Sequence, residues 1–186
     1  MRRFGQAVFL SLVLVGLAVV SAASPAKAKA QGKARNSELR QKWLEKEVRH
    51  VLVMQFDYTV FDNLAFRVDG ERVELVGQVV APSLRSSAEK GVKQIEGVEQ
   101  VVNKIEVLPL SPFDDRLRLE LYRAIYGDGG LFHYSLQAVP PIHIIVKNGK
   151  VVLEGVVSIE TDKNLASLRA NGVPGIFSVT NHLRVE

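Results

Sequence analysis

The sequence predicts an α+β fold made of two tandem α-β-β-α-β units, each a three-stranded sheet covered by two helices on one face. Three observations support this prediction. Glycine, asparagine and apolar positions recur 78 residues apart, as in Gly77 and Gly155. Each copy contains two helical patterns with apolar residues three or four apart, and each contains one hairpin signal between alternating apolar residues. A sheet of this kind has one apolar face, which two amphipathic helices can cover.

The internal repeat consists of residues that keep their chemical class at one spacing. A strand motif at residues 73–79 returns at residues 151–157, and a second motif at residues 97–107 returns at residues 175–185. Agreement at this many positions is difficult to obtain by chance, so the chain contains two copies of one unit. The matched positions are Gly77, Gly97, Val98, Val101, Asn103, Ile105 and Val107 in the first copy and Gly155, Gly175, Ile176, Val179, Asn181, Leu183 and Val185 in the second.

Residues 1–22 have the order of a secretory signal peptide. Arg2 and Arg3 precede an apolar run over residues 7–20, and small residues follow that run. The run is short for a membrane-spanning helix, which needs about 20 apolar residues, but an uncleaved N-terminal anchor stays open as an alternative. We therefore expect an exported protein of the periplasm or envelope, or one attached peripherally to a membrane. Removal of the signal takes away Arg2 and Arg3 and no acidic residue, which lowers the formal net charge from +4 to +2.

Residues 23–36 are rich in alanine and lysine and lack a core pattern, which predicts a flexible tether. Its basic residues could touch anionic lipid headgroups or cell-wall polymer, and a solubilising linker without a partner is an equal alternative. Elsewhere the basic residues form no stripe with interleaved aromatic residues, so we do not expect nucleic acid as a partner. The basic residues of the tether are Lys27, Lys29, Lys33 and Arg35.

The first unit covers residues 37–108. Asn36 or Ser37 is the expected cap of its first helix, and Asp69–Gly70 between alternating apolar residues is a strong hairpin signal. Gly77 falls in the middle of a strand on the apolar face, and we interpret it as a position where a helix packs closely. The expected elements are a helix over residues 37–52, strands over residues 64–68 and 73–79, a helix over residues 83–96 and a strand over residues 101–107.

The second unit covers residues 112–186 and repeats this order after a short, proline-containing link. Ser111 is the expected cap of its first helix, with Pro112 in the first turn. Asn148–Gly149 is the hairpin signal, because both residues tolerate positive φ. Units of this size are marginal alone, so we expect the two copies to pack together. The elements after the first helix are strands over residues 142–146 and 151–157, a helix over residues 161–172 and a strand over residues 179–185.

Residues that could perform enzymatic chemistry are nearly absent. The chain has no cysteine, which excludes disulfides, thiolate metal sites, a cysteine nucleophile and a lipidated cysteine. Asp114 and Asp115 form an acid pair, but their position in a first helical turn favours interaction with the helix dipole over catalysis. The glycine-rich residues 127–130 lack the lysine of a phosphate-binding loop. We expect no catalytic residue, metal or cofactor, because the histidines also lack metal-ligand spacing: His50, His133, His143 and His182.

The repeated motifs resemble the BON domain, the bacterial OsmY and nodulation domain. Its pattern of Val-x-Leu-x-Gly-x-Val, a helix and Gly-Val-x-x-Val-x-Asn-x-ϕ-x-Val, with ϕ apolar, is present at residues 73–107 and again at residues 151–185. The resemblance implies a non-catalytic envelope protein that associates with phospholipid membranes and supports envelope integrity or tolerance of osmotic stress. One branch of two-BON proteins is lipidated, and a chain without cysteine resembles the soluble periplasmic, OsmY-like branch. The matched glycines and asparagines are framework positions, so they imply the fold and not a ligand.

The second copy carries an insertion at residues 126–134, in which glycines precede aromatic residues. These aromatic residues could lie at a headgroup interface, or Leu131 and Phe132 could pack into the core or the contact between copies. Basic residues of this copy could meet anionic headgroups at about 1 kcal/mol each, or could be solvated only. Our hypothesis is binding of an anionic phospholipid surface, with a protein–protein adaptor of an envelope complex as the alternative and the oligomeric state open. The candidate lipid contacts are Leu131, Phe132, Tyr134, Lys147, Lys150, Lys163 and Arg169.

Overall fold

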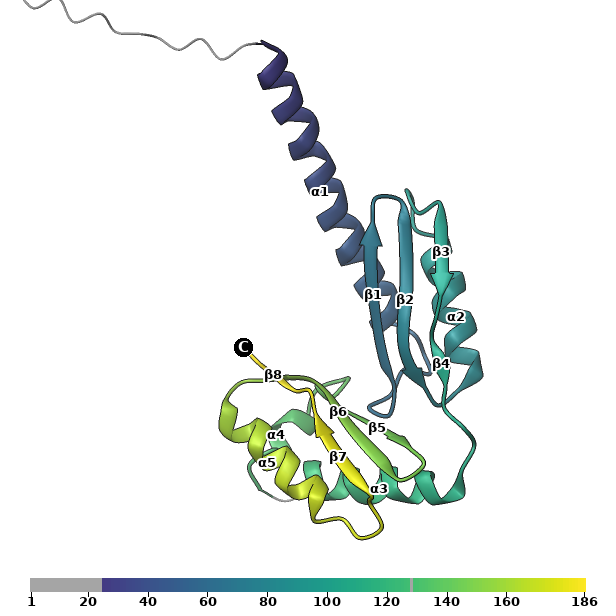
Figure 1. The fold of residues 1–186 in the computed structure, drawn as a ribbon, viewed down its shortest axis with the longest axis vertical. Coiled ribbons are helices and arrows are strands. Elements are labelled where there is room, and N and C mark those ends of the chain that lie inside the picture. The colour runs from purple at the N-terminus through teal and green to yellow at the C-terminus, as the bar shows by residue number, and fades with distance from the viewer. Residues whose placement is uncertain (1–24, 128) are drawn as a thin grey trace, which may run out of the picture. The chain divides into compact units, whose positions relative to one another are not determined.

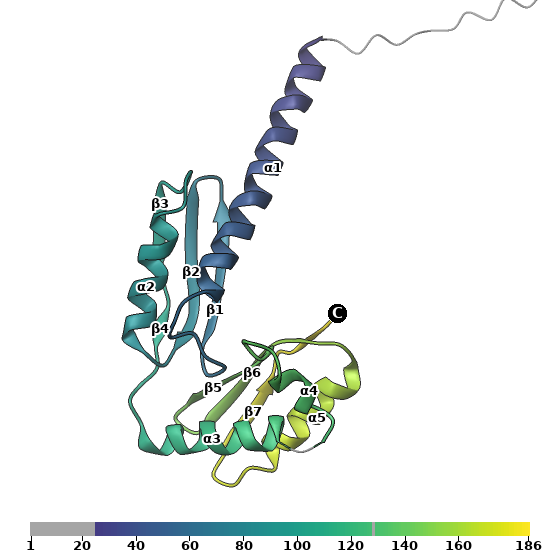
Figure 2. The same cartoon turned by 180° about the vertical axis from the view of Figure 1, so that it is seen from behind.

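The computed structural model describes residues 25–127 and 129–186, drawn in Figure 1 and from behind in Figure 2. Residues 37–186 form one compact unit that contains both copies of the repeat. The expected signal peptide, residues 1–22, lies outside the described residues. None of the described helices combines the length and the apolar character that crossing a bilayer requires.

Helix α1, Pro25–Val53, begins at Pro25 and not at Ser37. The expected helix cap at Asn36 or Ser37 is therefore wrong, and residues 25–36 are helical where a flexible coil was expected. The physical reason is composition, because alanine, lysine, glutamine and arginine are among the best helix formers and proline is accepted in a first helical turn. A linking role for this segment stays a prediction.

The first repeat places its strands in the order β1, β2, β3, with β4 also paired to β2. Strand β1 is antiparallel to β2, whereas β3 and β4 are parallel to β2. The expected single last strand is thus two short strands in one line. Both helices lie on the same side of the sheet (Figures 1 and 2). After α1 the elements are β1 Asn63–Asp69, β2 Arg72–Val79, α2 Pro82–Lys93, β3 Gln100–Asn103 and β4 Glu106–Val107.

The second repeat has the same topology and one additional short helix. Its strands run in the order β5, β6, β7, with β8 paired to β6. Every element from the second strand onward lies 78 residues after its counterpart, as β6 does after β2. The expected α+β class and tandem architecture are confirmed. The elements are α3 Pro112–Tyr126, α4 Phe132–Ser135, β5 Ile142–Lys147, β6 Lys150–Val157, α5 Glu160–Asn171, β7 Ser178–Asn181 and β8 Arg184–Val185.

The repeated asparagine explains why the last strand is broken in both copies. Asn103 accepts a hydrogen bond from the backbone N–H of Ile105 at 3.1 Å and donates through Nδ2 to the carbonyl of Arg85 at 3.0 Å. Asn181 makes the equivalent bonds, accepting from Leu183 at 3.0 Å and donating to the carbonyl of Lys163 at 2.9 Å. The side chain thus replaces a strand bond and ties the break to the second helix of its repeat.

The repeated strand glycine is required by the neighbouring strand and not by a helix. Gly77 has φ +121°, and a Cβ atom there would lie 1.9 Å from the backbone oxygen of Asn63. Gly155 has φ +124° and would meet the oxygen of Pro141 at 1.9 Å. Our expectation of close helix packing at Gly77 and Gly155 was therefore wrong. Only glycine fits, because an L side chain would be strained and would also collide with the first strand of the hairpin.

The hairpin turn of the first repeat lies one residue later than expected. Asp69 pairs with Arg72, so Gly70 and Glu71 form the two-residue loop. Gly70 alone has positive φ there, +59°, the pattern of a type II′ turn. In the second repeat both loop residues have positive φ, 52° at Asn148 and 71° at Gly149, the pattern of a type I′ turn. Both turn types match the twist of a hairpin, so the shift leaves the strand pairing intact.

Each repeat has its own apolar core, and one loop joins them. The first core contains Leu44, Val48 and Leu52 of α1 packed against the sheet. The second core contains the corresponding residues of α3 and also Val60, which precedes β1 in the first repeat. The backbone N–H of Ile144 in β5 donates to the carbonyl of Val60 at 2.8 Å. The copies therefore pack together, as expected for units of this size.

Candidate functional site

Two of the seven candidate lipid contacts are core residues. Leu131 is 0% exposed and Tyr134 is 4% exposed, and both belong to the second core. The Tyr134 hydroxyl donates to Asp162 Oδ2 at 2.7 Å and accepts from the N–H of Ser158 at 2.8 Å. Neither side chain can reach a membrane in this fold, so this part of the expectation is wrong. The insertion folds back as α4 because an apolar and a hydrogen-bonded aromatic side chain both find partners in the core.

The other candidates lie at two different ends of α3. Phe132, which is 51% exposed, follows the C-terminal end of α3. Arg169 lies at that end too and donates to the carbonyl of Ile125 at 3.0 Å. Lys147 and Lys150 instead flank the β5–β6 turn, which contacts the first turn of α3. These ends are about 22 Å apart along a helix of 15 residues, so the candidates do not form one surface.

The basic candidates also differ in exposure and in whether their charge is paired within the protein. Lys147 forms an ion pair with Glu106 of the first repeat. Lys163 is half-buried on α5, and its backbone carbonyl accepts the bond from Asn181. Lys150 is exposed at the turn. Of the four basic candidates, Lys150 is therefore best placed to meet an external anion.

An exposed aromatic and basic patch surrounds the β5–β6 turn. Phe177 is 75% exposed and Phe113 is 37% exposed. Both rings lie over Gly149, because a Cβ atom there would meet Phe177 Cδ2 at 2.7 Å and Phe113 Cε1 at 3.4 Å. The guanidinium of Arg116 lies 5.5 Å from the centre of the Phe113 ring. We call this set, Phe113, Arg116, Lys150 and Phe177, the turn patch.

The two aromatic members of the turn patch were not among the contacts predicted from the sequence. Phe113 is in the first turn of α3, and Phe177 precedes β7, so 64 positions separate them in the sequence and only the fold brings them together. A signal was present in the repeat comparison, because Phe177 stands 78 residues after Glu99. An apolar residue that replaces a charged one at an exposed framework position marks a surface difference between the copies.

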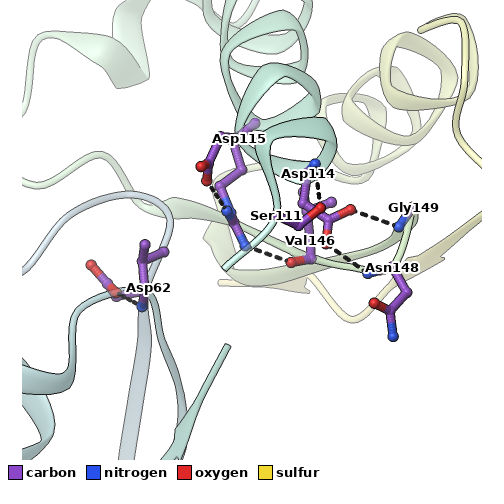
Figure 3. Close-up of polar contacts among 9 residues, drawn as sticks. Asp62, Ser111, Asp114, Asp115, Val146, Asn148 and Gly149 are labelled. Carbon is purple, nitrogen blue, oxygen red and sulfur yellow. Dashed lines mark hydrogen bonds and ion pairs between the residues drawn. The ribbon is translucent and has the colours of Figure 1, made fainter. Parts of the chain in front are cut away.

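A buried carboxylate holds the turn in place, as Figure 3 shows. Asp114 is 0% exposed and accepts hydrogen bonds from the backbone N–H groups of Asn148 and Gly149, each at 2.8 Å. Ser111 caps α3 by accepting from the N–H of Asp114 at 3.2 Å. Hydrogen bonds to a charged acceptor are among the stronger ones in proteins. Asp114 therefore holds the backbone of the β5–β6 turn, over which the aromatic rings of the turn patch lie. The role near the helix dipole that we expected for Asp114 stays a prediction.

Asp115, the second member of the acid pair, also has a structural partner. It forms an ion pair with Arg118, whose Nη2 donates to the carbonyl of Val146 at 2.8 Å (Figure 3). The carboxylates of Asp114 and Asp115 thus bind different groups and share no ligand. In residues 25–127 and 129–186, no three acidic or histidine side chains are arranged to hold a metal ion.

Two histidines have specific partners on the sheet of the second repeat. His143 stacks on Tyr58 of the first repeat, with ring centres 5.4 Å apart. Burial lowers the pKa of His143 below its usual value of 6.5, and burial also raises the pKa of Tyr58 to about 12. His182 Nδ1 lies 2.7 Å from Glu154 Oε1 at the surface. His143 Nδ1 is buried without a hydrogen-bond partner among the described residues, whereas Nε2 lies 3.4 Å from the Tyr58 hydroxyl.

The repeated topology and its glycine and asparagine framework define the family. The BON domain family matches residues 40–109 and again residues 117–186. The chain therefore belongs to the BON domain family and contains the domain twice. BON domains are non-catalytic, and proteins that contain them are typically periplasmic or associated with the cell envelope.

No curated protein matches the chain. Among solved structures, the chain is similar to the C-terminal domain of CdsD, the structural protein of the type III secretion system of Chlamydia trachomatis, with 14% identity and a TM-score of 0.27. That match covers 76% of this chain and 96% of the other. A second structure of CdsD from the same organism matches with 14% identity and a TM-score of 0.28, covering 77% of this chain and 92% of the other.

Proposed function

We propose that this protein is a non-enzymatic component of the cell envelope whose second BON domain binds anionic phospholipid surfaces through the turn patch. Such binding would support envelope integrity or tolerance of osmotic stress. The observation that favours the proposal is the exposure of Phe113 and Phe177 over the β5–β6 turn, with the guanidinium of Arg116 beside the Phe113 ring. Lys150 is exposed at the end of the same turn. Aromatic rings next to basic side chains are typical of surfaces that lie at a headgroup interface.

The magnitudes explain why such a patch needs both kinds of residue. Burial of an exposed phenylalanine side chain contributes about 1.5–3 kcal/mol. A lysine or arginine near an anionic membrane surface contributes about 1 kcal/mol, and salt weakens that contribution. Neither phenylalanine alone nor charge alone gives stable attachment, whereas two rings and two cations around one turn give several kcal/mol.

The fold also reduces the conformational entropy that the turn patch would lose on binding lipid. Asp114 and the type I′ geometry of Asn148–Gly149 hold the turn before any lipid is present. Phe177 precedes β7 directly, and its backbone N–H donates to the carbonyl of Gly149 at 2.9 Å. The ring is therefore presented by a backbone that is already fixed, which reduces the entropy lost on binding.

Vesicle sedimentation with two matched phenylalanine variants tests the proposal. Phe177→Ser removes the most exposed ring of the turn patch, and Phe132→Ser removes an exposed ring at the other end of α3. We expect Phe177→Ser to weaken binding to anionic vesicles at least about tenfold, while Phe132→Ser binds within about twofold of the unchanged protein. Binding that is equal for neutral and anionic vesicles, or an equal loss in both variants, would contradict the proposal.

The second candidate function is a protein–protein adaptor of an envelope complex. It is favoured by a groove on the first repeat that combines exposed Trp43 and Met54 with acidic residues and lies far in sequence from the turn patch. Crosslinking that recovers one stoichiometric protein partner, together with no vesicle binding, would favour the adaptor over the membrane proposal.

A further inference from the structure

A groove on the helical layer of the first repeat is not used by the proposed membrane contact. It has a volume of about 530 Å³ and lies between the C-terminal half of α1 and the end of α2. Its apolar walls include Trp43, which is 45% exposed, and Met54, which is 69% exposed, with half-buried Ile95 beside them. Large exposed apolar side chains gathered around a depression are typical of interaction sites.

Gly91 keeps this groove open. It is the tenth residue of the twelve-residue helix α2, as Arg169 is the tenth residue of the twelve-residue helix α5. A Cβ atom at Gly91 would lie 2.8 Å from Val51 Cγ1 and 3.3 Å from Gln55 Nε2. A side chain at this position would thus lie across the groove, and its absence is what exposes the surface between the two helices.

The second repeat indicates which chemistry this surface accepts. There Arg169 lies against the last turn of α3, with Nη1 donating to the carbonyls of Ala124 at 3.4 Å and Ile125 at 3.0 Å. Carbonyl groups at the C-terminal end of a helix favour a cation, because the helix dipole is negative there. The corresponding end of α1 includes Val51, whose carbonyl accepts a bond from Gln55 Nε2 at 2.8 Å. The first repeat therefore has the same helix end, with the neutral amide of Gln55 in place of the arginine.

The charges of the two surfaces are opposite. Glu47 and Glu96 line the groove of the first repeat, and no basic side chain of residues 34–127 and 129–186 lies within ion-pair distance of either. The matching surface of the second repeat is lined by Arg123 and Arg169 with Glu120. His50 also lines the groove of the first repeat. Two carboxylates and a helix C-terminus together attract a positive group.

We propose that this groove binds a segment of a partner protein that presents an arginine side chain flanked by apolar residues. The guanidinium would lie beside the Gln55 amide, near Glu47 and Glu96, where Trp43 could contribute a cation–π contact. The apolar neighbours of the arginine would cover Met54 and Ile95. This proposal rests on the second candidate function, the protein–protein adaptor, and deepens it by naming the chemistry of the partner segment; it is independent of the membrane contact of the second repeat.

Trp43 is the one tryptophan of the chain and lines the groove, so its fluorescence reports on binding there. The full chain is titrated with a synthetic amphipathic helix that places one arginine between leucines. A matched peptide has glutamine in place of that arginine. We expect a saturable change in Trp43 fluorescence with the arginine peptide and at least about tenfold weaker binding of the glutamine peptide. Equal affinities for the two peptides would overturn the proposal.

Three variants sharpen the test. Gly91→Arg gives the first repeat the residue that the second repeat has, and we expect it to abolish peptide binding. The double variant Glu47→Lys, Glu96→Lys keeps Gly91 and reverses two charges at the groove. It therefore tests the proposal even if Gly91→Arg lowers the stability of the protein. We expect the double variant to bind the arginine peptide at least about tenfold more weakly. Phe177→Ser is the matched control and should bind the peptide like the unchanged chain.

Two results would overturn the proposal. One is peptide binding by the double charge variant that equals that of the unchanged chain. The other is a Trp43 response to anionic vesicles as large as the response to the peptide, because it would make the groove a membrane surface. The two proposals are tested by different measurements: vesicle sedimentation tests the membrane proposal, and the Trp43 peptide titration tests this one. We expect Phe177→Ser to lose vesicle binding and to keep peptide binding, so either proposal can fail without the other.

Discussion

The two BON domains share one framework and differ in the surfaces that the framework presents. At the hairpin-turn end, the first domain has an ion pair of Arg40 with Glu71 at 2.9 Å, and both side chains are solvated. The second domain has Phe113 and Phe177 at the same end, over Gly149. The correspondence is direct, because Gly97 faces Arg40 and its counterpart Gly175 faces Phe113.

The opposite exchange occurs on the helical layers. The first domain has Gly91 and an open, acidic groove with exposed Trp43, whereas the second has Arg169 and a basic surface. The two domains have the same residue where the backbone leaves no room for a side chain. At Gly77 and Gly155, a Cβ atom would collide with a backbone oxygen of the neighbouring segment. The two domains thus share the residues that the backbone requires and differ at surface positions where the backbone sets no such requirement.

The largest expected effect tests the shared framework. Gly155→Ala places a Cβ atom at φ +124° and 1.9 Å from the Pro141 oxygen, so we expect it to lower the free energy of unfolding by at least about 2 kcal/mol. Gly172→Ala is the matched control, because it has no positive φ and its nearest contact would be 3.4 Å from the Arg169 oxygen. Urea unfolding followed by circular dichroism measures both. A Gly155→Ala variant as stable as Gly172→Ala would show that the close approach is not required.

A smaller effect tests the difference at the turn end. Asp114→Asn replaces a charged acceptor of two backbone hydrogen bonds, and we expect a loss of about 2 kcal/mol in the free energy of unfolding. In the first domain the corresponding position is Gln41, an exposed residue that bonds Glu45 on its own helix. Gln41→Asn should therefore change stability by no more than about 0.5 kcal/mol. Equal effects of the two variants in chemical unfolding would mean that the carboxylate is not what holds the turn.

The smallest expected effect concerns the contact between the domains and its pH dependence. Burial lowers the pKa of His143, which stacks on Tyr58, while Asp62 and Glu154 act in the opposite direction. The folded chain thus binds fewer protons at this site than the unfolded chain. The contribution of His143 to stability is present above its unfolded pKa of 6.5 and is lost as the pH falls through the depressed folded value.

Unfolding midpoints measured across this pH range test that sign. We expect the stability of the unchanged protein to fall by up to about 1 kcal/mol between pH values of about 7.5 and 5.5, and His143→Phe to reduce that dependence. His182→Gln is the control, because His182 is exposed and paired with Glu154. The first domain has Ala65 at the position of His143, so no equivalent group titrates there. A pH dependence that persists in His143→Phe would place its origin at another group.

Most of the element order could be predicted from the sequence because the signals are local. Apolar spacing along α2 and α5, turn residues at Asn148–Gly149 and the cap at Ser111 act within a few residues of themselves. The repeat then added independent support, since each pattern appeared twice. The expected start of α1 was wrong because it was placed where the apolar core pattern begins. A helix can extend beyond the residues that pack against a core, as α1 does.

The candidate site could be predicted less well, because exposure is not a local property. Leu131, Phe132 and Tyr134 lie within four residues of one another, yet Phe132 alone among them is exposed. Phe113 and Phe177 are distant in the sequence and lie over the same turn. Whether an aromatic side chain faces solvent depends on which other elements pack over it, and periodicity contains no information about that.

The sequence by itself determined the duplication, the strand and helix order, the family and the absence of cysteine chemistry, because composition, period and spacing are properties of the chain. Only the tertiary structure decided that Gly77 and Gly155 face a strand, that Val60 enters the second core, and that Asp114 binds the turn beneath Phe177. Each of these depends on atoms that meet through folding across long sequence separations. The framework of this protein is thus visible in its sequence, whereas its interaction surfaces arise from packing.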